Sequence, residues 1–331
     1  MTRSAFASLL LCVGVLIAAT SGARAQALVR VDGSSTVFPV TEAVARAFQV
    51  RQRGMARITV GISGTTGGFR KFCRGETDLQ DASRPILKSE IQVCKASGVQ
   101  YVELPVAFDA LTVAVSPKNT WVKSLTVADL KRIWEPAAQG RIVRWSDVDP
   151  SWPHEPLMLV GPDGDSGTFD YFTEVIVGAR GSSRSDYARS DDDNVIAHSI
   201  STNPYALGYL PYAYYATHAN RLKAVPIDSG AGPVPPALEN VANRTYAPLS
   251  RPLFIYVNAR SASRPEVRTF MEFFLEHGRG LIEDVRYLPL STAAYSMAAQ
   301  NLRSGKYGTV FDGEPEWNLA VEEILTRAVK R

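Results

Sequence analysis

The sequence predicts an α/β fold whose hydrophobic core is divided between two lobes. Segments rich in β-forming residues alternate with segments whose apolar residues recur at helical spacing, without an internal repeat or a coiled-coil heptad. About 306 residues follow the first 25, which is enough for two separate cores. Three loops rich in glycine and hydroxyl side chains each join a strand to a helix, and this repetition indicates anion binding more strongly than a single loop would.

Residues 1–25 are predicted to be an export signal that is cleaved after Ala25. Arg3 supplies a positive charge, Leu9–Ala19 is apolar but too short to span a membrane, and Ala23-Arg-Ala25 has the small-x-small pattern of a cleavage site. We therefore expect the protein in the periplasm.

The charge and cysteine content of the remaining chain exclude several classes of function. Loss of Arg3 and Arg24 leaves 34 basic and 33 acidic residues, a formal net charge of +1, and the basic residues are dispersed, so nucleic acid is not an expected partner. Cys73 and Cys94 form an even pair in an exported protein, which predicts one disulfide; two free buried thiols are the alternative. No histidine lies near them, so neither a metal site nor a cofactor is predicted.

The first two strand–loop–helix units precede Cys73. Val29–Val31 is a short strand, and the loop after it leads into a helix that has Pro39 in its first turn. Ile58–Val60 is the second strand, and the loop Gly61–Gly68 separates it from a helical segment. Further on, Ser83 and Arg84 end an extended segment, from which both could face the same anion. For Arg84, a surface arginine paired with a carboxylate is the alternative.

The remaining chain continues the alternation. Ala110–Val115 is rich in β-forming residues and is expected to carry the chain from one lobe to the other. The other predicted strands are 141–145, 157–160, 206–215 and 252–257, and the other predicted helices are 125–134, 195–200, 267–274, closed by Gly278, and 295–302.

The third loop, Gly161–Phe172, has the clearest anion-binding character. Its apolar residues adopt helical spacing from Gly167 or Thr168 onward, and a helix begins with unpaired N–H groups and a partial positive charge. Ser166 and Thr168 add hydroxyls there, although the same residue types also form ordinary helix caps. The sequence Asp-Ser-Gly here is also found around the nucleophile of trypsin-like proteases. Only His154 precedes Ser166, and its surroundings do not fit a catalytic base, so no catalytic residue is predicted.

Together, these segments resemble the phosphate-binding receptors of bacterial high-affinity phosphate ABC transporters. The matching segments, in the family's order, are Gly33–Pro39, Ser63–Phe69, Asp81–Ile86, Phe108–Val113, Leu130–Trp134 with Trp145, Asp165–Thr168, Asn203–Tyr212 and Pro248–Asn258. The resemblance implies a periplasmic-binding-protein fold of type II, with the anion between two lobes and no catalysis. It places the first lobe in residues 26–112 and 251–331 and the second in residues 113–250. It also implies a monomer that passes phosphate to a membrane permease.

The resemblance also implies which residues hold the anion. Thr36, with the N–H of Val37 and the neighbouring Ser35, would bind from the first loop, and Thr65 with Ser63 from the second. Asp165, Ser166, Gly167 and Thr168 would complete the site from the other lobe, with Ser83 and Arg84 facing it.

Two departures from the family pattern affect this site. Better-known members carry an arginine where this chain has Pro162 and an aspartate where it has Ser83. The aspartate accepts a hydrogen bond from protonated phosphate, which sulfate cannot donate at neutral pH. We therefore expect one of Asp81, Asp109 and Asp165 to be the acceptor, and Arg84 or Arg184 to be the charged donor.

Three other functions compete with this prediction, and the sequence disfavours the last of them. The same loops could serve another oxyanion, such as sulfate, molybdate or a phosphonate. A phosphate sensor that reports to a signalling partner would have the same binding site. A secreted phosphatase would need a nucleophile with a base or a metal cluster, and the scattered histidines supply neither.

Overall fold

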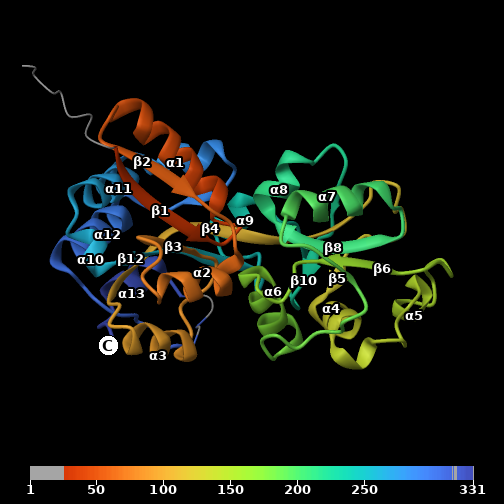
Figure 1. The fold of residues 1–331 in the computed structure, drawn as a ribbon. Coiled ribbons are helices and arrows are strands. Elements are labelled where there is room, and N and C mark those ends of the chain that lie inside the picture. Colours follow the sequence, from red (N-terminus) through yellow and green to blue (C-terminus); the bar gives the residue numbers. More distant parts are fainter. Residues whose placement is uncertain (1–25, 315, 317–318, 331) are drawn as a thin grey trace, which may run out of the picture.

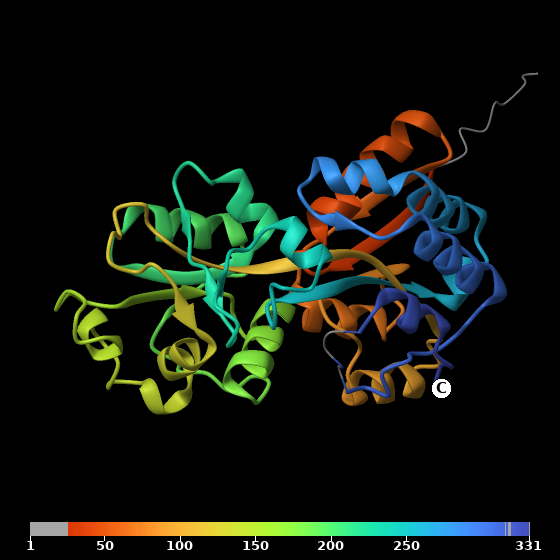
Figure 2. The same ribbon diagram turned by 180° about the vertical axis from the view of Figure 1, so that it is seen from behind.

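The computed structural model describes residues 26–314, 316 and 319–330. The predicted export signal, residues 1–25, lies outside the described residues. Two lobes lie side by side, and long strands run from one to the other (Figure 1; Figure 2 from behind). No helix in the described part of the chain is long and apolar enough to cross a membrane.

One ten-stranded sheet extends through both lobes in the order β2-β1-β3-β12-β4-β8-β6-β7, with β9 and β13 also pairing with β4. The strands of the first lobe are β1 (Ala27–Gly33), β2 (Ala56–Val60), β3 (Leu79–Ala82), β12 (Ser250–Asn258) and β13 (Leu288–Pro289). Those of the second lobe are β6 (Met158–Gly161), β7 (Ala188–Arg189), β8 (Ala206–Pro211) and β9 (Lys223–Ala224). A separate small sheet joins β5 (Leu125–Thr126), β10 (Ile227–Asp228) and β11 (Pro233–Val234).

Strand β4 (Tyr101–Val115) belongs to both lobes. It pairs with β12 as far as Ala110, and from Leu111 onward it pairs with β8. Nearly all of its side chains are buried, which explains the long apolar run in the sequence. Strand β12 begins beside this change of partner, so two strands connect the lobes. The lobe boundaries expected at 112–113 and 250–251 lie within or beside these two strands.

Helices cover the sheet of the first lobe. They are α1 (Phe38–Arg51), α2 (Gly64–Phe72), α3 (Lys88–Ala96), α10 (Ala259–Ala262), α11 (Pro265–Asp284), α12 (Thr292–Ser304) and α13 (Val321–Thr326). Phe48 of α1 packs edge-on against Phe270 and Phe273 of α11, with ring centroids 5.3 and 5.5 Å apart. Gly278 does not end α11 as expected: the helix continues through it to Asp284, and Gly278 is buried on its packed face.

The second lobe has its own core and its own helices. These are α4 (Val127–Trp134), α5 (Trp145–Val148), α6 (Gly167–Phe172), α7 (Asp193–Thr202), α8 (Tyr212–Thr217) and α9 (Leu238–Ala242), with a 3-10 turn at Pro136–Ala138 and a π-helical turn at Thr173–Val177. The strand predicted for 206–215 ends at Pro211, because proline lacks the N–H that a ladder needs and suits the entry to a helix. Residues 141–145 contribute only a bridge, between Arg144 and Pro156.

The predicted disulfide is present. Cys73, just after α2, is bonded to Cys94 in α3, across a sequence separation of 21 residues. Both cysteines are buried in a cluster with Phe69 and Phe72. The bond therefore fixes α3 against α2, the helix that carries the second hydroxyl-rich loop.

Candidate functional site

The three hydroxyl-rich loops meet where the two lobes face each other. Thr36 follows β1, Thr65 lies in the first turn of α2, and Thr168 lies in the first turn of α6. All three side chains are buried. The hydroxyl oxygens of Thr36 and Thr168 are 3.1 Å apart, so the first and third loops are in contact across the lobes.

The second loop joins this cluster through Gly167. Thr65 Oγ1 lies 3.0 Å from Ser83 Oγ and accepts a hydrogen bond from the Ser83 N–H at 3.2 Å. A Cβ added to Gly167 would lie 2.4 Å from Ser83 Oγ and 2.5 Å from Thr65 Oγ1. Only glycine therefore allows the start of α6 to approach the first lobe this closely.

Arg251, at the start of β12, is the charged donor of the cluster. Its Nη2 donates to Thr168 Oγ1 at 2.8 Å and to Asp109 Oδ2 at 3.2 Å, and lies 3.4 Å from Thr36 Oγ1. Its Nη1 donates to the carbonyl of Gly167 at 2.9 Å. The side chain is fully buried, and its Nε has no hydrogen-bond partner among the described residues.

Asp109 is the carboxylate beside this arginine. Asp109 of β4 lies opposite Arg251 in the register with β12, so the two side chains share one face of the sheet. Burial raises the pKa of Asp109 to about 6, although Arg251 and the N–H dipoles of Tyr212 and Ala110 partly offset the shift. Oδ1 makes no hydrogen bond of ordinary geometry among the described residues.

This arrangement suits a small anion that carries a proton. The hydroxyls of Thr36, Thr65, Ser83 and Thr168 can donate to oxygen atoms, and Arg251 adds charge-assisted donors. Asp109 adds a hydrogen-bond acceptor. Only an anion that carries a proton can donate a hydrogen bond to it. Within residues 26–314, 316 and 319–330, no group of histidine, cysteine or acidic side chains has the arrangement of a metal site.

Three predicted site residues contact other protein groups instead. Ser35 Oγ donates to Asp193 Oδ2 at 3.0 Å, and Ser63 Oγ donates to Asp32. The carboxylate of Asp165 forms two hydrogen bonds of 3.1 Å with Arg70 and is half-exposed. These side chains surround the cluster without joining it.

Two further predicted residues lie at helix starts. Ser166 caps α6, its Oγ accepting the Thr168 N–H at 3.1 Å. The helical segment that follows is longer than α6 itself, because the π-helical turn continues it to Val177. Val37 is fully buried at the position that caps α1.

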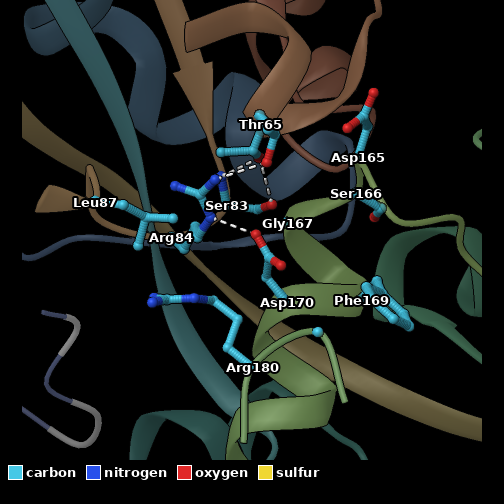
Figure 3. A network of polar contacts seen from close by, with 12 residues as sticks. Thr65, Ser83, Arg84, Leu87, Asp165, Ser166, Gly167, Phe169, Asp170 and Arg180 are labelled. Carbon is cyan, nitrogen blue, oxygen red and sulfur yellow. Dashed lines mark hydrogen bonds and ion pairs between the residues drawn. The ribbon is translucent and has the colours of Figure 1, made fainter. Parts of the chain in front are cut away.

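The structure differs from the sequence prediction for the arginines. Arg84 directs all five of its N–H groups at the protein, at distances of 2.7–3.2 Å from Asp170, Glu90, Thr66 and the carbonyl of Pro85. Figure 3 shows the contact with Asp170. Arg184 is bonded to Asp186 and to two backbone carbonyls of the second lobe. Arg84 has no donor left for an anion, and four of the five N–H groups of Arg184 are directed at protein groups outside the cluster, so the geometry favours Arg251.

Asp81 also lies away from the cluster. It is buried, and its Oδ1 accepts from the Thr41 hydroxyl of α1 at 3.0 Å. Of the three expected carboxylates, Asp109 is the one that shares a hydrogen-bond donor, Arg251, with the hydroxyl groups of the cluster. The pairing of Arg251 with Asp109 was missed in the sequence, although a charged residue inside an apolar run, as in Phe108-Asp-Ala-Leu, is a signal of a buried partner.

The chain is similar to known proteins over most of its length. Residues 18–277 match the model of a PBP superfamily domain. Protein SphX of Synechocystis sp. is 47% identical over 312 residues, covering 94% of this chain and 93% of the relative. The phosphate-binding protein PstS of Staphylococcus epidermidis is 35% identical over 274 residues, covering 82% of each chain. The structure of a putative phosphate ABC transporter substrate-binding protein from Clostridium perfringens, with bound phosphate, superposes with a TM-score of 0.67 at 26% identity, covering 80% of this chain and 100% of that one.

Proposed function

The chain belongs to the PBP superfamily and, within it, to the family of the phosphate-binding protein PstS, and from this premise we propose that it binds inorganic phosphate between its lobes. We propose further that it delivers the anion to the permease of an ABC transporter. The observation that carries the proposal is the buried cluster that joins the hydroxyls of three loops to Arg251 and Asp109.

The donors come from both lobes. Thr36, Thr65 and Ser83 would donate from the first lobe, and Thr168 from the second. Arg251 would supply the charge that the family's usual arginine, replaced here by Pro162, would otherwise provide. The backbone N–H groups of Val37 and Gly167 would add uncharged donors. Ser166 would stabilise the start of α6 by capping it.

Asp109 would accept a hydrogen bond from the protonated oxygen of the bound phosphate. Its pKa of about 6 leaves most of the carboxyl ionised at neutral pH, so it can accept a hydrogen bond from a protonated anion. Sulfate carries no proton at that pH and would face an unpaired negative charge. This difference would make the site selective for phosphate.

The remaining parts of the proposal follow from the sequence and the family. The protein would be cleaved after Ala25, act in the periplasm as a monomer, and catalyse no reaction. Lobe closure would exclude water from the anion, and the permease would recognise the closed form.

Isothermal titration calorimetry tests the proposal directly. The mature protein is unfolded, stripped of bound anion, refolded, and titrated at neutral pH with phosphate and, separately, with sulfate. We expect tight one-to-one binding of phosphate and no response to sulfate. Equal binding of both anions would contradict the role of Asp109, and absence of phosphate binding would refute the proposed function.

A further inference from the structure

Arg84 lies at the contact between the lobes, close to the hydroxyl cluster but with its own set of partners. It follows β3 in the first lobe, and its side chain is fully buried. Its guanidinium lies over the ring of Phe69, with 5.7 Å between the guanidinium carbon and the ring centroid. Such a position needs partners for every N–H group, because an unpaired buried charge is strongly destabilising.

Four of the five N–H groups find partners within the first lobe. Nη1 and Nη2 each donate to one carboxylate oxygen of Glu90 at 2.9 Å, which is a paired, planar contact. Nη1 also donates to the carbonyl of Pro85 at 3.2 Å, and Nη2 to Thr66 Oγ1 at 2.8 Å. Arg84 is therefore held in place by residues that stay with it however the lobes move.

The fifth donor reaches the other lobe. Arg84 Nε donates to Asp170 Oδ2 at 2.7 Å, a short charge-assisted hydrogen bond (Figure 3). Asp170 belongs to α6, two residues after Thr168, and only 11% of its side chain is exposed. The contact needs no anion, because both partners are protein groups.

From this geometry we propose that Arg84 is a positioning residue that draws the lobes together in the absence of an anion. Separation of the lobes breaks the contact with Asp170 and leaves the pairing with Glu90 intact. Closure of the lobes therefore forms one additional buried, charge-assisted hydrogen bond. The Arg84 side chain is already ordered, so this bond costs little side-chain entropy. The same contact holds the start of α6, with Gly167 and Thr168, against the first lobe.

The two carboxylates offer a matched pair of variants. Asp170→Asn removes the charged acceptor across the lobes. Glu90→Gln removes the charged acceptor within the lobe, and leaves Asp170 as the remaining carboxylate partner of Arg84 among the described residues. Small-angle X-ray scattering of the ligand-free, refolded proteins measures closure directly. We expect Asp170→Asn to shift the open-to-closed ratio by about tenfold or more toward open, with a larger radius of gyration. Glu90→Gln should not open the protein and should favour the closed form.

The effect on anion binding is a second measurement, and it rests on the proposed function. Asp170→Asn should release phosphate at least about tenfold faster than wild type and leave the association rate within about threefold. Equal ligand-free radii for wild type and Asp170→Asn would overturn the inference, as would opening by Glu90→Gln. Should the wild-type protein fail to bind phosphate, the scattering comparison would still decide the role of Arg84.

Discussion

The pairing of Arg251 with Asp109 can be tested by replacing each residue alone and both together. Both side chains are fully buried, so Arg251→Gln leaves Asp109 without its charged partner. Removing one member of a buried ion pair costs about 3–5 kcal/mol, a large part of the 5–15 kcal/mol that a typical fold has in total. If Arg251 also binds the anion, loss of one charge-assisted hydrogen bond costs another 1.5–3 kcal/mol of binding free energy, or roughly ten- to a hundredfold in affinity.

The double variant Arg251→Gln with Asp109→Asn separates the two effects. Two uncharged amides leave no unpaired charge, so the free energy of unfolding should return to within about 1 kcal/mol of wild type. Phosphate affinity should not return, because the charged donor and the proton acceptor are both absent. Urea unfolding without ligand measures the stability, and isothermal titration calorimetry measures the affinity.

A matched control lies in the first lobe. Arg264 pairs with Asp78 and Glu266 but is not part of the hydroxyl cluster. Arg264→Gln should change the stability without weakening phosphate binding. Our reasoning would be refuted if Arg251→Gln folded normally and bound phosphate within threefold of wild type, or if the double variant were no more stable than Arg251→Gln.

Three further predictions concern closure, pH and the disulfide. Gly167→Ala places a methyl group 2.4 Å from Ser83 Oγ, so calorimetry should show at least about a tenfold loss of phosphate affinity, whereas Gly164→Ala, with no atom within 4 Å of its Cβ, should bind normally. Burial raises the pKa of Asp81 from 3.8 to about 8, so the folded protein keeps a proton that the unfolded chain releases, and stability should fall as the pH rises between these values. Asp81→Asn should make this slope smaller in urea unfolding at pH 5 and 8, and the remainder should come from the buried carboxyls of Glu103, Asp109 and Asp193, whose pKa values burial also raises. An unchanged slope would contradict the assignment. Replacing Cys73 and Cys94 by serine opens a loop with a sequence separation of 21 residues and should lower the free energy of unfolding by about 3 kcal/mol, with phosphate affinity little changed.

The hydroxyl loops could be predicted from the sequence because each lies directly between a strand and a helix. Thr36, Thr65 and Thr168 are all found at the starts of helices, and neighbouring residues alone indicate that position. Their meeting in one cluster required the family resemblance, since Thr36 and Thr168 are separated by 132 residues. The local sequence pattern predicts where a loop lies, but it does not predict which other loop it contacts in the fold.

The charged residues could not be assigned for the same reason. Arg251 and Asp109 are 142 residues apart, and only the register of β12 with β4 brings them together. Arg84 was expected to face the anion because it ends a strand beside Ser83. An arginine can pair with any negatively charged group, and in this structure its partners are the carboxylates of Glu90 and Asp170. A contact between Arg84 and a bound anion stays a prediction.

The two connecting strands also determine the order in which the lobes can be completed during synthesis. The core of the second lobe uses residues between Ala110 and Leu249, a continuous piece of chain. The main core of the first lobe combines residues 29–107 with residues as late as Leu325. Until β12 arrives, β3 and β4 have no strand between them. The amino-terminal segment of the first lobe, which is made first, must therefore stay unfinished until almost the whole chain is available.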